Sequence, residues 1–208
     1  MPQRSTKRLV AADQLVAHSS PPSSSSSSPF SSSSSSSSSC ILLSLYESEL
    51  LRSFVRGIDT KVIGLKSLHL SGDPMNKVHL NYFSPGDELG WHFDNSEFFV
   101  NLLLQAPIAG GEFEFVPRSR TGKDPNNYAL VQQVLEGAKS VTRVEPPSGS
   151  LLIFRGKYSI HRVSQVIDGE RITAILTYEK QPGVIMNEYT RKKFFGRALD
   201  DVERQNRS

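Results

Sequence analysis

Short apolar runs with a two-residue period, separated by turn residues, fill most of the chain between Lys61 and Glu179. A two-residue period is that of a β-strand with one buried face. The predicted strands are 78–83, 90–94, 98–105, 112–116, 140–144, 150–155, 160–167 and 171–179. Pro85-Gly86-Asp87 and Asp168-Gly169 have the composition of turns. Many short strands with few helices indicate a mainly β fold with supporting helices, a jelly-roll sandwich.

Three segments have helical periodicity and helix-end signals. The predicted helices are 44–56, one that opens at 124–127 and ends before Gly137, and one from Asn187 to about Phe195. Ser44-x-x-Glu47 has the form of a capping box, and Gly196 is a suitable C-terminal stop.

The first forty-odd residues differ in composition from the rest. Ser19 to Ser39 is almost entirely serine, which has too little apolar surface to offset the entropy of ordering. We therefore expect a disordered segment over 1–41 and one domain over 42–208. The basic, acid-poor start of the chain is typical of an organellar transit peptide, although a translated repeat or a gene-model artefact explains it equally well. The expected location is cytoplasmic, or organellar if this segment is a transit peptide.

Charge and cysteine content exclude several classes of partner. The first 45 residues hold three bases and one acid, so the rest of the chain carries about +1 of the total charge of +3. Such a balance does not predict binding to nucleic acid. The apolar run after Cys40 is too short to span a bilayer, so we expect no membrane association. A single cysteine excludes a disulfide framework and fits a reducing compartment. The oligomeric state is not indicated.

A histidine and a carboxylate two residues apart form the strongest functional signal. On a strand, His92 and Asp94 would point to the same face. His161 follows after a gap of roughly 65 residues, in another predicted strand, and Arg171 comes ten residues later. Two imidazoles and one carboxylate with open positions opposite are the ligand set of non-haem Fe(II) oxygenases. If His161 instead caps a turn, Arg171 would pair with Glu170 or Glu179 on the surface.

Between about Leu42 and Arg197 the chain resembles the Fe(II)/2-oxoglutarate-dependent dioxygenases. The segments that carry the resemblance are 85–98, 110–115 and 154–163. The resemblance implies a double-stranded β-helix, the cupin-like variant of the jelly roll. The chain is most similar to a small branch of hydroxylases and halogenases that act on free amino acids. Halogenases of this branch have Gly in place of the carboxylate ligand, so Asp94 favours hydroxylation.

The resemblance also implies the cofactors and the reaction. His92, Asp94 and His161 would bind Fe(II), and 2-oxoglutarate and O2 would occupy the remaining positions. The expected products are succinate, CO2 and a hydroxylated small molecule, an amino acid or a derivative. Ascorbate is the expected reductant in vitro.

Residues of two strands are candidates to hold the co-substrate. Arg171 and Thr173 share a strand face and match a common R-x-[S/T] pattern of the family, in which the arginine binds the distal carboxylate. Asn81 matches a family position that contacts the co-substrate. Phe83 stands where some members have tyrosine, and we expect it to form a wall of the site.

Candidates for contact with the substrate are Trp91, Asn95 and Glu114. If Phe113 and Phe115 fill the core, Glu114 faces away from it; if the interior is partly polar, Glu114 could accept a substrate ammonium group. His79 could line the site, but a structural role is the better interpretation. Loop 117–127 is either a lid with a carboxylate clamp or a solvated basic loop.

Two further functions remain open on the sequence. One is a protein or nucleic-acid hydroxylase of the same superfamily. The other is a non-catalytic metal-binding jelly-roll module, such as a Zn(II) lectin-like domain, that reuses the three ligands.

Overall fold

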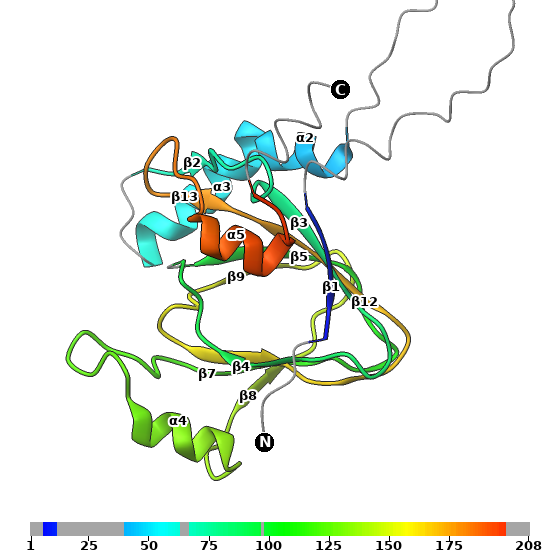
Figure 1. The fold of residues 1–208 in the computed structure, drawn as a ribbon, viewed down its shortest axis with the longest axis vertical. Coiled ribbons are helices and arrows are strands. Elements are labelled where there is room, and N and C mark those ends of the chain that lie inside the picture. The colour runs from blue at the N-terminus through cyan, green and yellow to red at the C-terminus, as the bar shows by residue number, and fades with distance from the viewer. Residues whose placement is uncertain (1–5, 12–39, 63–66, 97, 199–208) are drawn as a thin grey trace, which may run out of the picture. The chain divides into compact units, whose positions relative to one another are not determined.

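The computed structural model describes residues 6–11, 40–62, 67–96 and 98–198 (Figure 1). The chain falls into two compact units. The first unit takes its residues from Met1–Leu9 and His79–Tyr178, and the second from Val10–Val78 and Glu179–Ser208. All of the candidate site residues predicted from the sequence belong to the first unit.

The first unit is built on two antiparallel sheets. One has the order β1 (Arg8–Ala11), β3 (Val78–Phe83), β12 (Arg171–Leu176), β5 (Phe99–Gln105), β9 (Leu151–Phe154). The other has the order β4 (Leu89–His92), β10 (Ile160–Val163), β7 (Phe113–Val116), β8 (Thr142–Val144). A short pair joins β6 (Ala109–Gly110) to β11 (Val166–Asp168).

The chain crosses between these sheets as a jelly roll does. It passes from β3 to β4, to β5 and to β7, changing sheet each time, and does so again from β8 through β9 and β10 to β12. This connectivity confirms the predicted mainly β, double-stranded β-helix fold. The predicted strand 160–167 is divided, because β10 ends at Val163 and β11 begins at Val166. The strand predicted over 171–179 is likewise divided into β12 and β13 (Tyr178–Glu179).

Aromatic side chains fill the interior of this unit. The cluster is made of Phe83, Phe113, Val163 and Val166, with Leu89, Phe99, Phe115, Leu152 and Phe154 packed against it. The alternation along β7 places both of its phenylalanines in this cluster, so Glu114 between them lies on the opposite face of the sheet.

Helix α4 (Tyr128–Leu135) covers that opposite face (Figure 1). Val134 packs there against Val116 and Ile160, and Trp91 and Phe93 extend the cluster. The helix confirms the sequence prediction, and Gly137 follows it with a φ of 73°, the left-handed conformation of a C-terminal stop.

The helices α2 (Ile41–Glu47), α3 (Glu49–Val62) and α5 (Glu188–Phe195), together with β2 (His69–Leu70), belong to the second unit. The single helix predicted over 44–56 is wrong, because the chain breaks at Ser48. Ser44 lies inside α2 and caps nothing, whereas Ser48 Oγ accepts the Leu51 N–H at 3.5 Å.

Helix α5 has the ends that the sequence predicts. Asn187 Oδ1 accepts the Thr190 N–H at 2.8 Å, and Gly196 has a φ of 68°. These two local signals were therefore sufficient to place the helix.

The start of the chain departs from the predicted domain boundary. Arg8–Ala11 forms β1 in the five-stranded sheet, so a domain that begins only at residue 42 is wrong for this stretch. Ser19–Ser39, on which the expectation of disorder rests, lies outside the described residues. No helix among the described residues is long and apolar enough to cross a membrane.

Candidate metal centre

Three side chains from separate parts of the first unit converge on one point. The candidate ligand atoms of His92, Asp94 and His161 all lie within 4.8 Å of one another. Asp94 Oδ1 is 3.6 Å from His92 Nε2, and Asp94 Oδ2 is 3.5 Å from His161 Nε2. The pairing of β4 with β10 brings the imidazoles together, since His92 and His161 stand opposite each other in the register. The predicted convergence of the triad is thus present.

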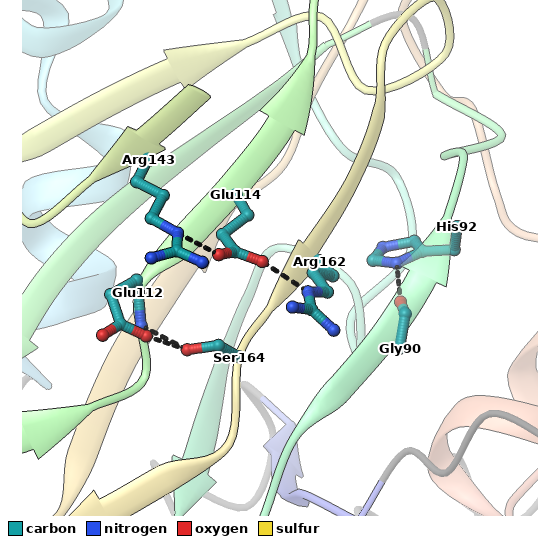
Figure 2. A network of polar contacts seen from close by, with 7 residues as sticks. All are labelled: Gly90, His92, Glu112, Glu114, Arg143, Arg162 and Ser164. Carbon is teal, nitrogen blue, oxygen red and sulfur yellow. Dashed lines mark hydrogen bonds and ion pairs between the residues drawn. The ribbon is translucent and has the colours of Figure 1, made fainter. Parts of the chain in front are cut away.

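Backbone carbonyls orient both imidazoles. His92 Nδ1 is 2.8 Å from the Gly90 oxygen (Figure 2), and His161 Nδ1 is 2.9 Å from the Ser159 oxygen. A carbonyl only accepts, so Nδ1 carries the proton in each ring. The Nε2 lone pairs are then directed to the shared point, as metal-ligating histidines require.

Asp94 does not belong to the strand that carries His92. β4 ends at His92, and Asp94 lies two residues beyond it, where its N–H donates to the Gly156 oxygen at 3.1 Å. A Cβ added at Gly156 would overlap the Asp94 carboxylate and stand 2.5 Å from its Cγ. The absence of a side chain at Gly156 therefore makes the room that the carboxylate occupies.

The donor set fits a divalent cation. Asp94 Oδ2 is buried and has no hydrogen-bond partner among the described residues. Burial lowers the pKa of His161 to about 4, and burial together with the neighbouring His161 lowers that of His92 to about 4. Burial raises the pKa of Asp94. A bound cation stabilises this combination, because it binds neutral imidazoles and compensates the charge of a carboxylate oxygen that has no hydrogen-bond donor.

These pKa shifts predict that the metal-free protein loses stability in acid. Between about pH 6.5, the ordinary histidine pKa, and pH 4, the unfolded chain binds protons that the half-buried His92 and the buried His161 of the folded protein do not. The unfolding free energy should fall with decreasing pH in this window, by up to about 1.4 kcal/mol per pH unit for each histidine. The raised pKa of Asp94 opposes part of this loss. Denaturant titrations of chelator-treated protein at several pH values measure the unfolding free energy. An unfolding free energy that does not change between pH 6.5 and pH 4 would contradict the lowered pKa values of the two histidines.

Arg171 lies on β12 with its side chain buried and without an acidic partner. It is 4% exposed, and its guanidinium forms no ion pair or hydrogen bond with any residue that the structure describes. Burial lowers its pKa to about 10. The alternative of a surface pair with Glu170 or Glu179 is therefore wrong. An uncompensated buried cation is costly, so the site is suited to an anionic ligand.

Polar groups without partners also lie on β12 and on the neighbouring strand β3. Thr173 Oγ1 and Asn81 Oδ1 are buried and find no hydrogen-bond partner in the described part of the chain. β3 and β12 are neighbours, so the three co-substrate candidates lie on adjacent strands. Phe83, the predicted wall, has its ring 5.5 Å from the Arg171 guanidinium carbon.

A fourth buried polar residue without a hydrogen-bond partner, Asn101, was not predicted from the sequence. Asn101 on β5 is 8% exposed, and its Oδ1 has no hydrogen-bond partner among the residues described. It pairs in register with Ile175, two residues from Thr173, and thus shares the inner face of the sheet. The sequence signal was available, since an asparagine interrupts the apolar run Phe98–Leu104.

Two of the three predicted substrate contacts, Trp91 and Glu114, lie on the outer side of the sheet and not at the metal centre. Trp91 packs in the cluster beneath α4, and Asn95 is exposed. Glu114 is 1% exposed and accepts hydrogen bonds at 2.5 Å from both Arg143 Nε and Arg162 Nε (Figure 2). Its carboxylate lies on the outer face of the sheet, so a contact with a substrate ammonium group is not supported.

Glu114 instead holds two strands to β7. Removing its carboxylate would leave two arginines without their shared partner, of which Arg162 also lies over the Trp91 ring at 4.9 Å. We expect Glu114→Ala to lower the unfolding free energy by about 2 kcal/mol, less than for a fully buried pair because the arginines reach solvent. Metal affinity should not change. Denaturant unfolding and a metal titration test the two parts, and a large loss of metal binding would contradict this purely structural role.

Loop 117–127 is anchored to the strand that carries His161. Ser119 Oγ accepts the Ile160 N–H at 2.5 Å, and the Arg118 N–H donates to Ser159 Oγ at 3.1 Å. Arg120 lies 3.4 Å over the Phe93 ring, while Arg118 and Lys123 are exposed. Near Ser159 the loop supports the orientation of His161, and its exposed cations fit the solvated-loop interpretation.

The family model described as Halogenase D matches residues 7–192. Similar solved structures include a 2OG-Fe(II) oxygenase family oxidoreductase from Burkholderia pseudomallei, 17% identical, with a TM-score of 0.48 over 68% of this chain and 55% of that chain. A prolyl-4-hydroxylase from Pseudomonas putida is 17% identical, with a TM-score of 0.40 over 65% of this chain and 58% of that chain.

A viral collagen prolyl hydroxylase from Paramecium bursaria Chlorella virus-1 is 16% identical, with a TM-score of 0.40 over 62% of this chain and 69% of that chain. The chain thus spans little more than half the length of the first two of these proteins. No curated protein sequence matches it. The family match includes β1, the ligand triad and Arg171, and it extends over most of the sequence. The chain belongs to the Halogenase D family.

Proposed function

We propose that the protein is an Fe(II)- and 2-oxoglutarate-dependent oxygenase that hydroxylates a small molecule, an amino acid or a relative of one. The observation that carries the proposal is the combination of the ligand triad with the buried, unpaired guanidinium of Arg171. Fe(II) with bound 2-oxoglutarate and O2 would supply the oxidising power, and the co-substrate would leave as succinate and CO2.

The residues of the chain would bind and orient. His92, Asp94 and His161 would hold the metal from one side and leave the opposite positions open. Arg171 would hold the distal carboxylate of 2-oxoglutarate through paired N–H donors. Asn81 and Thr173 offer buried polar atoms beside it. The phenylalanine cluster around His161 would keep water away from that side of the centre.

Hydroxylation is favoured over the halogenation that the family name suggests. In the halogenases that the chain resembles, Gly replaces the carboxylate ligand and leaves a position for chloride. Here Asp94 is present, and Gly156 makes room for its side chain. The chain is thus built to hold a carboxylate at the position that chloride would need.

Turnover tests the proposal and separates it from the non-catalytic alternative. The full chain, loaded with Fe(II) and supplied with ascorbate, chloride and 2-oxoglutarate, should release succinate slowly even without substrate. The full chain is needed because a start at residue 42 would delete β1. A panel of twenty amino acids, screened for faster succinate release, should yield a product heavier by about 16 mass units. If the iron-loaded protein releases no succinate, the non-catalytic metal-binding module is favoured. A chlorinated product would overturn the role of Asp94.

Two variants separate binding of the metal from packing of the wall. His92→Ala should abolish succinate release, because it removes a ligand from the shared point. Phe83→Ala should only weaken it, since this ring lies against Arg171 and is not one of the three candidate ligands. Succinate measured over time on both variants tests this, and equal losses would contradict the assigned roles.

A further inference from the structure

The N-terminal segment enters the first unit beside the candidate site. The Thr6 N–H donates to the Glu88 oxygen at 3.0 Å, and the Glu88 N–H donates to Thr6 Oγ1 at 3.2 Å. Glu88 immediately precedes β4, the strand that carries His92. On the other side of Lys7, Arg8 opens β1 and lies 4.8 Å over the Tyr82 ring. Lys7 is thus held between two anchored residues.

The side chain of Lys7 points to the interior. Thr6 and Arg8 are exposed, whereas Lys7 between them is partly buried. Lys7 immediately precedes β1, and neighbouring side chains on an extended chain point to opposite faces, so we infer that Lys7 is directed away from the surface on which Arg8 meets Tyr82. Tyr82 alternates in the same way with Asn81 and Phe83, which are buried. Lys7 therefore lies on the same side of the sheet as the co-substrate candidates.

The charges that act on the Lys7 ammonium group belong to the site. Burial lowers its pKa to about 8; beyond that, the Asp94 carboxylate raises the pKa and Arg171 lowers it. Lys7 in turn contributes to the lowered pKa values of His79 and His92. Its ammonium group is therefore within electrostatic range of both the metal ligands and Arg171.

Neither of these two cations is neutralised. As with Arg171, the Lys7 ammonium group has no hydrogen bond or ion pair with any residue of the described ranges. Two like charges in a region of low dielectric repel each other, and desolvation adds to the cost. A ligand with two negative charges, extended from the metal ligands toward Arg171, would neutralise both.

We propose that Lys7 is a second cationic residue of the co-substrate site, which binds 2-oxoglutarate together with Arg171. The inference rests on the proposed function and goes beyond it, because it makes the segment before β1 a wall of the site. It gives a specific task to a residue in the stretch whose composition is typical of a transit peptide. Lys7 is a binding residue here and has no part in holding the metal.

Binding measurements on oxygen-free full-length protein loaded with Mn(II) test the proposal. At pH 7, Lys7→Gln should weaken 2-oxoglutarate binding about tenfold to a hundredfold, the effect of one hydrogen bond to a charged group. Lys7→Arg, which retains the charge, should restore most of the affinity. Calorimetric titration with 2-oxoglutarate measures the affinity of the parent protein and of both Lys7 variants.

Arg8→Gln is the matched control. It removes the same charge one residue away, from a side chain that lies on the Tyr82 ring, and should leave 2-oxoglutarate affinity within twofold of the parent protein. An equal loss in Arg8→Gln and Lys7→Gln would overturn the proposal, because the effect would then come from net charge or from the seating of β1.

Titration with Mn(II) alone gives a second test, because the metal affinity should not fall together with the affinity for 2-oxoglutarate. Lys7 repels a cation at the triad, so Lys7→Gln should leave metal affinity unchanged or increase it. Weaker metal binding in this variant would indicate a structural role and overturn the proposal. Tighter metal binding with unchanged 2-oxoglutarate affinity would also overturn it, in favour of a tethered competitor for the metal position. If the parent protein binds no 2-oxoglutarate, the proposed function itself fails.

Discussion

Replacing Gly156 by alanine should abolish metal binding while the protein remains folded. The new methyl group would overlap the Asp94 carboxylate, so Asp94 would have to turn away from the point that His92 and His161 share. Gly156 does not have a positive φ, so alanine adds volume without backbone strain. We expect metal affinity to fall at least about a hundredfold, the upper range for loss of a group that orients a ligand. A metal titration followed by spectroscopy or calorimetry measures it.

Gly122→Ala is the control for this prediction. A Cβ at Gly122 meets no atom within 4 Å, and its φ is likewise not positive. This variant should bind metal as the parent protein does, and circular dichroism should show both variants folded. Normal metal binding in Gly156→Ala would mean that Asp94 is not a ligand, and the oxygenase proposal would lose its centre.

Replacing Arg171 by glutamine should remove the affinity for 2-oxoglutarate and leave the metal site intact. The guanidinium is buried without an acidic partner, so no ion pair of the protein is lost with it. Two charge-assisted hydrogen bonds to a carboxylate would be lost, and we expect affinity to fall about a hundredfold or more. The unfolding free energy of the variant should rise, because an uncompensated buried charge disappears. Calorimetry with 2-oxoglutarate and denaturant unfolding test both expectations.

Arg143→Gln provides the comparison for Arg171. Arg143 lies on the outer face of the second sheet, paired with Glu114, and its side chain is 64% exposed. Its loss should leave the affinity for 2-oxoglutarate unchanged. If Arg171→Gln binds 2-oxoglutarate as well as Arg143→Gln does, the distal carboxylate has another partner. The role of the arginine in the R-x-[S/T] pattern of the family then does not apply to Arg171.

Local sequence signals determined the type of fold and the identity of the candidate metal ligands. Alternating apolar residues are a direct consequence of a strand with one buried face, and they placed most of the strands of the first unit within two residues. The two histidines and the carboxylate were recognisable because their types and their spacing in the sequence match a known set of metal ligands. Asn187 and Gly196 likewise sufficed for α5, since capping is a contact within one turn.

Only the tertiary structure decided which face of a strand is the interior. A two-residue period puts Glu114 on the face opposite Phe113 and Phe115, but it does not tell which face is the interior. The neighbouring strands decide this, because they carry the arginines that Glu114 meets. Asp94 owes its position to Gly156, and Lys7 owes its position to the contacts that its neighbours Thr6 and Arg8 make with Glu88 and Tyr82. Contacts between residues so far apart in the chain leave no periodic trace, because they depend on how the strands pair and not on local conformation.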